Sequence, residues 1–334
     1  MADTKVLVVD DSLTMRALIS RALDSIPGVQ VVGAADGAAE ARDMVAKFRP
    51  DVMTLDIEMP GMNGIEYLAE IMDNKPMPVI MFSTLTEAGA NASVEALRLG
   101  AVDCFPKPKV ATQSEFDVIL GKLGKCIRNA KGASARRIKA EKPAAAFAWN
   151  NRVMAIGADA SSTQNLFSLL GTFPENCPPT IIVQHVRADL AGNLIEKLNE
   201  QCAAKVLPAE DGAPLVQGTV YIASPGEAHI IVDKWPEGQL KLMPRDPIAG
   251  ERPSISLLFA SIAKATSGEV VGMLLTQGGE DGQAGIKAIL AAGGHVVAQG
   301  AEGQEPGYYL YKGMASQPVP GGDIGTAALK ICNK

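Results

Sequence analysis

The sequence predicts an α/β protein built on parallel β-sheets. Short apolar runs recur along the chain, at residues 6–9, 52–55, 79–82, 153–156, 180–183 and 271–275. Continuous runs of this length are typical of strands buried on both faces of a sheet. Stretches with helical periodicity, at residues 15–22, 38–47 and 190–198, alternate with these runs. The alternation indicates right-handed crossovers between parallel strands.

The composition is that of an ordinary globular protein, with 47% hydrophobic and 20% charged residues. The formal net charge of −6 gives no general electrostatic reason to expect nucleic acid as a partner. The five cysteines form no C-x-x-C pair, which suits reduced thiols in a cytosol. The N-terminus lacks the apolar run of a signal peptide, and no segment approaches the roughly 18 apolar residues that span a bilayer. We therefore expect a cytoplasmic protein without membrane insertion.

The chain divides near residues 131–146, which have little apolar periodicity and a cluster of positive charge. These basic residues could steer an anionic surface, but a solvated hinge is the simpler interpretation. A length of 334 residues suggests two domains, because one domain typically holds ~100–200 residues. We expect a first domain at residues 1–128, a linker at 129–150 and a second domain at 151–334.

Carboxylates follow two predicted strands of the first domain. Asp10 and Asp11 come directly after residues 6–9, and Asp56 follows residues 52–55. Ligand sites of open parallel sheets collect at the carboxyl ends of the strands, so these three side chains are expected to converge. Their mutual repulsion would be relieved by Mg²⁺, which prefers hard oxygen ligands. A strand that ends in Asp-Asp is also a common start for a helix, so this pattern alone is weak.

Two further residues extend the acidic pattern. Ser83 follows the predicted strand at residues 79–82, and Lys107 lies between two prolines after Cys104-Phe105. The lysine could supply a fixed positive charge for a developing phosphoryl group, although a lysine before proline is usually a surface loop residue.

At these spacings, residues 4–125 resemble the receiver domain of two-component response regulators, a flavodoxin-like fold. The resemblance includes the run Asp-Ile-Glu-Met-Pro-Gly-Met-Asn-Gly at residues 56–64. It implies that Asp56 accepts a phosphoryl group from a histidine kinase and that Asp10, Asp11 and Asp56 hold Mg²⁺. It also implies that Ser83 senses the phosphate and that Lys107 contacts it. One position departs, because Cys104 stands where the family commonly has an aromatic residue.

From about Arg152 onward the chain resembles the catalytic domain of the chemotaxis protein-glutamate methylesterases (CheB type). The resemblance rests on Ile156-Gly157-Ala158, Ile182-Val183-Gln184-His185, residues 209–212 with 218–223, Arg252-Pro253-Ser254, and residues 274–276 with Asp281-Gly282. It implies a doubly wound parallel sheet. It also implies hydrolysis of glutamyl methyl esters, and deamidation of certain glutamines, on the cytoplasmic region of methyl-accepting chemoreceptors. The family uses a serine nucleophile, a histidine base and an aspartate that orients the base.

By this resemblance, His185 is the base and Asp281 its partner, while Asp159 falls at the position of the serine. The family's Gly-Ala-Ser-Thr-Gly-Gly reads Gly-Ala-Asp-Ala-Ser-Ser at residues 157–162, so Ser161 and Ser162 take two glycine positions. The family's Gly-Met-Gly becomes Gln-Gly-Gly at residues 277–279, and residues 303–322 are hard to match at all. His229 and His295 have no comparable setting and are expected to be structural or surface residues.

The sequence therefore favours a chemotaxis response regulator with an output domain of methylesterase fold whose catalytic serine has been lost. Such a domain would act by binding receptors or a chemotaxis-type histidine kinase, or by draining phosphate from the kinase. The alternative is an active methylesterase and glutamine deamidase that uses Ser161 or Ser162. A DNA-binding regulator is weaker, because no helix-turn-helix pattern is legible and the basic residues cluster only at 131–146.

Overall fold

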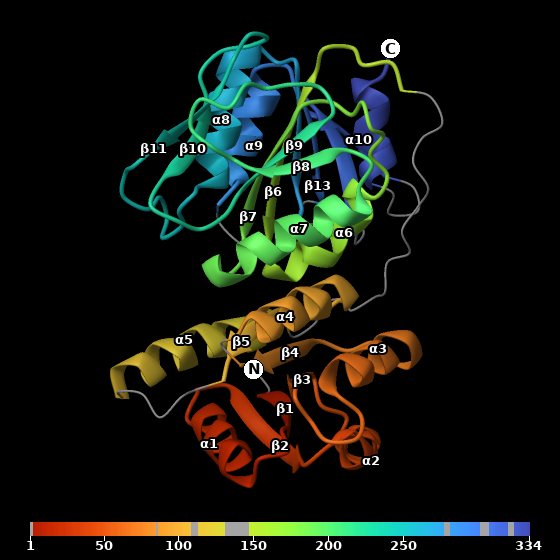
Figure 1. The fold of residues 1–334 in the computed structure, drawn as a ribbon, viewed down its shortest axis with the longest axis vertical. Helices are drawn as coiled ribbons and strands as arrows, with labels where there is room; N and C mark the ends of the chain where they lie inside the picture. The colour runs from red at the N-terminus through yellow and green to blue at the C-terminus, as the bar shows by residue number, and fades with distance from the viewer. Residues whose placement is uncertain are drawn as a thin grey trace. The chain divides into compact units, whose positions relative to one another are not determined.

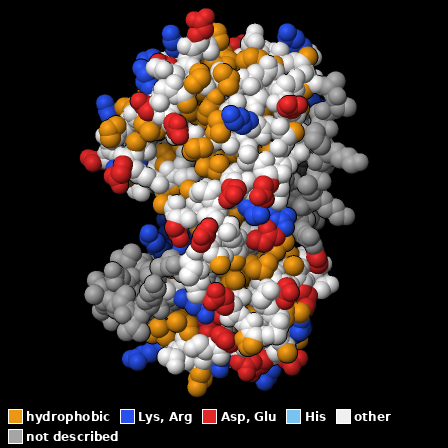
Figure 2. All heavy atoms as spheres, viewed as in Figure 1, with side chains coloured by type: hydrophobic (Ala, Val, Ile, Leu, Met, Phe, Trp, Pro, Cys, Tyr) orange, Lys and Arg blue, Asp and Glu red, His pale blue; other side chains and the backbone are white. Residues whose placement is uncertain are grey.

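The structure is a computed structural model and describes residues 3–84, 86–107, 113–130, 147–276, 281–300, 307–319 and 324–334. The chain divides into two compact units, Met1–Arg137 and Ile138–Lys334. Most of the expected linker lies outside the described residues, so the boundaries at 128 and 150 stay predictions. Within the described ranges, no helix is long and apolar enough to cross a bilayer. Acidic and basic side chains are interspersed on the face of each unit that Figure 2 shows.

The first unit alternates strands and helices. Its elements are β1 (Thr4–Val9), α1 (Leu13–Asp24), β2 (Val29–Ala35), α2 (Ala38–Phe48), β3 (Val52–Asp56), α3 (Gly64–Asn74), β4 (Val79–Ser83), α4 (Glu87–Leu99), β5 (Asp103–Pro106) and α5 (Gln113–Ala130). The strand order is β2-β1-β3-β4-β5, and every neighbouring pair is parallel. This is the flavodoxin-like order, so the predicted fold class of the first domain is confirmed.

The core of the first unit explains why its strands read as continuous apolar runs. On one face of the sheet, Val6 and Val8 of β1 pack with Ile80 and Phe82 of β4 against α1 and α5. Helices α3 and α4 contact each other elsewhere in the unit (Figure 1). In the register of β1 with β3, Val9 lies opposite Leu55. The residues that follow these two strands therefore come together at one edge of the sheet.

The second unit is larger and its sheet is mixed. Its elements are β6 (Val153–Asp159), η1 (Ala160–Ser162), α6 (Thr163–Leu170), β7 (Thr180–His185), η2 (Ala188–Leu190), α7 (Ala191–Gln201), β8 (Lys205–Pro208), β9 (Thr219–Ala223), β10 (His229–Val232), β11 (Leu240–Met243), α8 (Ile255–Thr266), β12 (Val270–Leu274), α9 (Gln283–Ala291), β13 (His295–Gln299), β14 (Tyr308–Lys312), β15 (Ala315–Pro318) and α10 (Ile324–Cys332). The main sheet has the order β15-β14-β13-β12-β6-β7-β9-β8, and β10 pairs with β11 in a separate hairpin.

The sheet of the second unit is parallel from β13 to β8, as the sequence predicts, with helices on both faces. Helices α8 and α9 pack on one face of the sheet, and α6, α7 and α10 lie on the other face (Figure 1). The buried core under α8 and α9 includes Val153, Ile181, Phe259 and Ile289. Strands β14 and β15 are antiparallel to their neighbours. This antiparallel edge falls within residues 303–322, where the sequence showed no pattern that predicts strands, so it was not foreseen.

Gly157 of β6 is a position where the fold needs a glycine. A Cβ atom at Gly157 would lie 2.4 Å from Cγ2 of Ile255 and 3.0 Å from Cδ1 of Leu274. Both neighbours are buried, so neither can withdraw into solvent. The first residue of α8 thus packs directly on the backbone of β6, next to the end of the strand.

We predict that Gly157→Ala lowers the free energy of unfolding by about 1–3 kcal/mol, because overpacking forces side chains and backbone to shift. Urea unfolding of the full chain measures the change. The control is Gly192→Ala in α7, where a Cβ would meet no atom within 4 Å. Alanine there should be neutral or stabilising by up to about 1 kcal/mol, because it is the better helix former. Equal effects of the two substitutions would contradict the packing argument.

Candidate functional site

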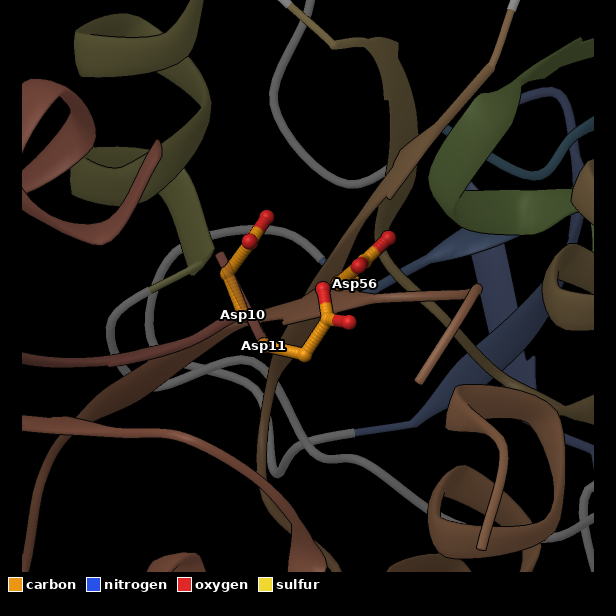
Figure 3. Close-up of side chains that lie close together, drawn as sticks. All are labelled: Asp10, Asp11 and Asp56. Carbon is orange, nitrogen blue, oxygen red and sulfur yellow. The ribbon is translucent and has the colours of Figure 1, made fainter. Parts of the chain in front are cut away.

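Three carboxylates meet at the edge of the first sheet. Asp10 and Asp11 follow β1, Asp56 ends β3, and one ligand atom from each lies within 4.8 Å of the others (Figure 3). Asp10 and Asp56 are buried, whereas Asp11 is exposed. The structure thus brings together the three residues that the sequence singled out as a metal site.

Lys107 joins this cluster from the end of β5. Its Nζ lies 2.6 Å from Asp56 Oδ2 and 3.3 Å from Asp10 Oδ2. Its backbone N–H donates to Ser83 O at 2.8 Å, which fixes the lysine against the end of β4. A single ammonium therefore faces two buried carboxylates.

Burial dominates the electrostatics of Asp56 and raises the pKa of its carboxyl group to about 6. The hydrogen bond and charge of Lys107 oppose this rise, and the nearby charge of Asp10 adds to it. Asp56 Oδ1 accepts a hydrogen bond from Glu58 N at 3.1 Å. One lysine thus compensates only part of the negative charge that the strands concentrate here.

The cluster fits a hard divalent cation such as Mg²⁺. Asp10 Oδ2 is buried and has an ion-pair distance to Lys107 but no hydrogen-bond geometry with any described group. Two buried carboxylates and one exposed carboxylate offer the oxygen ligands that such an ion prefers. Asp10, Asp11 and Asp56 are the residues that would hold the ion.

Ser83 is buried at the end of β4, and its hydroxyl lies 2.9 Å from Ser93 Oγ of α4. Ser93 Oγ also donates to Gly89 O at 2.7 Å. Cys104 Sγ in turn lies 3.3 Å from Ser93 O, so both residues contact the same position on α4. The side chain of Phe105, which follows Cys104, is buried against Phe82 with ring centroids 6.5 Å apart. The position where the family commonly has an aromatic residue is thus a buried thiol.

A cavity of about 650 Å³ opens beside Asp11 and Ser83. The residues Ile57, Glu58, Met59, Pro60, Asn63, Ile65, Glu66, Thr84, Ala88, Gly89 and Ala92 complete its lining. Glu58 Oε1 accepts a hydrogen bond from Thr84 Oγ1 at 3.2 Å across this lining. The cavity therefore adjoins the acidic edge of the sheet at Asp11 and Ser83.

In the second unit, Asp159 and His185 lie side by side at the ends of β6 and β7. They are direct partners in the parallel register of the two strands. The Asp159 side chain caps η1, because its Oδ1 accepts a hydrogen bond from Ser162 N at 3.1 Å. Its backbone carbonyl accepts a hydrogen bond from Gln184 Nε2 at 2.9 Å. The aspartate is thus firmly fixed at the end of its strand.

The same carboxylate oxygen also engages both candidate serines. Ser161 Oγ and Ser162 Oγ each lie 2.7 Å from Asp159 Oδ1. Ser162 is fully buried, and its hydroxyl is also 2.8 Å from Leu275 O, so its single proton serves two acceptors. Ser161 is only partly buried. Of the two alternative nucleophiles, Ser161 alone is open to a substrate.

His185 contacts groups other than Asp281. Its Nε2 lies 2.7 Å from Pro253 O, and because a carbonyl only accepts, this ring nitrogen carries the proton. Its Nδ1 lies 3.8 Å from Glu251 Oε2. Among the hydrogen bonds of the described residues, none joins His185 to Asp281, so the orienting contact that the family resemblance implies is missing.

Asp281 is buried and caps the N-terminus of α8. It accepts hydrogen bonds from Ile255 N at 2.7 Å, Ser256 N at 2.9 Å and Ser254 Oγ at 3.0 Å. Its own neighbour Gly282 donates to it at 2.9 Å. Asp281 thus fixes the segment whose Pro253 carbonyl binds His185, and acts on the histidine only through that segment.

His229 helps to fix the same segment before α8 and is fully buried. Its Nδ1 accepts a hydrogen bond from Ser254 N at 3.0 Å, and its Nε2 lies 2.9 Å from Asp246 O. It is therefore a structural residue close to the site. The substitutions noted at residues 277–279 lie outside the described residues, as do residues 303–306 and 320–322 of the segment at 303–322.

Sequence reasoning missed two neighbours of this site. Tyr308 of β14 lies close enough for the charge of Asp159 to add to burial, the larger cause, in raising the pKa of its phenol to about 12. Asn165 Nδ2 donates to Tyr308 Oη at 3.3 Å. Tyr308 lies within residues 303–322, where the sequence offered no motif that indicated it. Glu251, by contrast, directly precedes Arg252-Pro253-Ser254, one of the segments that carry the family resemblance.

Comparison with known proteins assigns the chain to a family. A family model described as "Response regulator receiver domain" matches residues 6–115, and one described as "CheB methylesterase" matches residues 154–314. A protein-glutamate methylesterase/protein-glutamine glutaminase 1 of Caulobacter vibrioides is 43% identical over 305 residues, covering 90% of this chain and 88% of the relative. A relative from Agrobacterium fabrum is named protein-glutamate methylesterase/protein-glutamine glutaminase. It is 40% identical over 338 residues, which cover 98% of this chain and 96% of the relative. With a receiver domain followed by a methylesterase domain and this identity over nearly its whole length, the chain belongs to the CheB-type protein-glutamate methylesterase family of chemotaxis response regulators.

Proposed function

We propose that this chain is a response regulator, phosphorylated on Asp56 by a chemotaxis-type histidine kinase, whose methylesterase-fold output domain has lost most of its esterase activity. The proposed loss of esterase activity is supported by the Asp159 carboxylate, which lies at the family's nucleophile position and accepts hydrogen bonds from Ser161 and Ser162. The output domain then acts by binding chemoreceptors or the kinase, or the receiver acts as a sink for phosphate.

The acidic edge of the first sheet supports phosphoryl transfer. Asp56 Oδ2 attacks the phosphorus of the donor, the new O–P bond forms, and the bond from phosphorus to the histidine nitrogen breaks. The ammonium of Lys107, 2.6 Å from that oxygen, stays in place to balance the charge of the transferred group. Mg²⁺ held by Asp10, Asp11 and Asp56 would supply further charge neutralisation on the phosphoryl oxygens.

The chemistry of a carboxylate argues against efficient ester hydrolysis at Asp159. Attack of its oxygen on the ester carbonyl would form an anhydride and would have to expel methoxide. Methoxide is a poor leaving group, and a carboxylate is a weak nucleophile. In serine proteases, loss of the nucleophile costs on the order of 10⁶ in turnover. The N–H of Ser162, which could otherwise face a substrate oxyanion, already donates to Asp159 Oδ1 at 3.1 Å.

One observation favours the alternative of a weak esterase and deamidase. The Ser161 hydroxyl donates to the Asp159 carboxylate at 2.7 Å, so Asp159 could accept its proton during attack. An aspartate is a weak base for this task, because general bases work best with a pKa near the working pH. Ser161 also stands two residues beyond the end of β6, away from the position that faces His185.

Phosphorylation should depend on Asp56 and on a divalent cation. We expect Asp56→Asn, or chelation of Mg²⁺ in the unsubstituted protein, to reduce labelling by a small acyl phosphate to background, because the acceptor oxygen or its counter-charge is lost. Mass spectrometry of the full chain measures the phosphoryl adduct. Asp43→Asn, an exposed carboxylate of α2, is the control and should leave labelling unchanged. Continued labelling of Asp56→Asn would show that another residue is the acceptor.

Esterase activity should be low and should return when the serine is restored. We expect Asp159→Ser to raise methanol release from methylated receptor by about 10²-fold or more, since a hydroxyl nucleophile regains its place. The assay uses the phosphorylated full chain and includes Ser161→Ala and Ser162→Ala as matched variants. Robust turnover of the unsubstituted protein that disappears in Ser161→Ala would establish the alternative function instead.

Asp281 should act as a structural cap. We expect Asp281→Ala to lower the free energy of unfolding by roughly 2–4 kcal/mol, because two backbone N–H groups and one hydroxyl lose a buried acceptor. Chemical denaturation of the full chain gives the value. Asp189→Ala, an exposed carboxylate of η2, should change stability by less than about 0.5 kcal/mol. A loss of stability at Asp281 no larger than at Asp189 would refute the capping role.

A further inference from the structure

Ser83 and Ser93 form a buried pair between the end of β4 and helix α4. Ser83 is 2% exposed and Ser93 is fully buried, and their hydroxyl oxygens lie 2.9 Å apart. Ser93 belongs to α4 and lies one turn after Gly89, whose carbonyl oxygen is 2.7 Å from Ser93 Oγ. These two contacts form a short chain of hydrogen bonds that leads from the acidic edge of the sheet into α4.

The direction of these hydrogen bonds follows from the number of protons. A serine hydroxyl has one proton, and a carbonyl oxygen only accepts. The proton of Ser93 is therefore donated to Gly89 O, which is the nearer of its two partners. Ser83 then donates its own proton to Ser93 Oγ. In this arrangement α4 uses the proton with which Ser83 would contact a phosphoryl group on Asp56.

The backbone of Ser83 is fixed, so its hydroxyl can change partner only by rotation about the Cα–Cβ bond. The Ser83 carbonyl accepts a hydrogen bond from Lys107 N at 2.8 Å, and Ser83 lies opposite Pro106 in the register of β4 with β5. Rotation between staggered positions moves the hydroxyl from one acceptor to another. The Ser83 hydroxyl therefore has to leave Ser93 before its proton can serve a bound anion.

The neighbouring strand contacts the same residue of α4. Cys104 of β5 is 1% exposed, and its Sγ lies 3.3 Å from Ser93 O. A thiol is a weak donor, so this contact contributes less than the hydrogen bond between the two hydroxyls. Ser93 thus connects α4 to the end of β4 through a hydroxyl and to β5 through a thiol.

We propose that Ser93 is a positioning residue that holds the Ser83 hydroxyl on α4 and so opposes phosphorylation. Recruitment of Ser83 by a phosphoryl group on Asp56 breaks the hydrogen bond to Ser93 and removes one contact between β4 and α4. The free energy of that hydrogen bond lowers the affinity of the site for the phosphoryl group. The inference rests on the proposed phosphorylation of Asp56 and names the α4 residue that is coupled to it.

The test measures the affinity of the full chain for beryllofluoride, a mimic of the phosphoryl group, by fluorine NMR in the presence of Mg²⁺. We expect Ser93→Ala to raise this affinity about three- to tenfold, because Ser83 no longer gives up a hydrogen bond. General damage to the fold would lower the affinity instead. Ser93→Thr restores a hydroxyl and should bind within about twofold of the unsubstituted protein.

Two further variants separate this role from the effect of alanine on a helix. Ser20→Ala changes a serine of α1 whose Oγ has no hydrogen-bond partner among the described residues, and it should leave the affinity unchanged. Ser93→Ala in a Ser83→Ala background should change the affinity by less than about twofold, because the hydroxyl through which Ser93 acts is absent. The amide spectrum of each variant without beryllofluoride shows whether it is folded.

Three outcomes count against the proposal. An affinity of Ser93→Ala equal to or below that of the unsubstituted protein overturns it, and so does a gain that persists in the Ser83→Ala background. Binding that is lost in Asp56→Asn but does not respond to Ser93→Ala refutes the role of Ser93 and leaves the proposed phosphorylation intact. A folded, unsubstituted chain that binds no beryllofluoride refutes both.

Discussion

The pairing of parallel strands is the constraint on which both sites depend. Because neighbouring strands run in the same direction, the residues that follow them meet at one edge even when they are far apart in sequence. In the first unit this brings Asp10 beside Asp56, and in the second it brings Asp159 beside His185. Buried charges placed in this way must find partners, since desolvation of an unpaired charge is costly. The partners that each carboxylate finds decide what the site can do.

The two units satisfy their carboxylates differently. At Asp56 the main partner is the charge of one lysine side chain, and burial still raises the pKa of the acid to about 6. Such an incompletely compensated cluster can take up a cation and a phosphoryl group. At Asp281 the partners are backbone N–H groups and a hydroxyl, which belong to the fold itself. That carboxylate has become part of the scaffold of α8.

Asp159 stands between these two cases. One of its oxygens is used by the fold, through Ser161 and Ser162, and the residue is partly exposed at the end of β6. The two serines at the positions of the family's glycines both donate to the same oxygen of the carboxylate, and they help to hold Asp159 in place. The second unit thus keeps Asp159 beside His185 at the strand ends, while among the described hydrogen bonds the histidine contacts Pro253 and not Asp281.

Much of this arrangement could be predicted because it is local. Apolar runs at residues 6–9 and 153–156 identify central strands, and site residues of both domains lie at the ends of these strands or directly after them. The role of Asp281 could not be predicted, because motif spacing names a residue without saying which donors surround it. Tyr308 could not be found either, since an antiparallel edge strand brings it to the site from a segment without a recognisable pattern.

The sequence by itself determined the family, the two α/β domains and the residues at the strand ends, because periodicity and motif spacing are properties of neighbouring residues. Only the tertiary structure decided how those residues are paired. His185 contacts the Pro253 carbonyl and not Asp281, and Asp159 binds the two serines that might have replaced it. The physical reason is that hydrogen-bond partners are selected by distance and direction in the folded chain, which depend on the packing of α8 on β6 and not on sequence order.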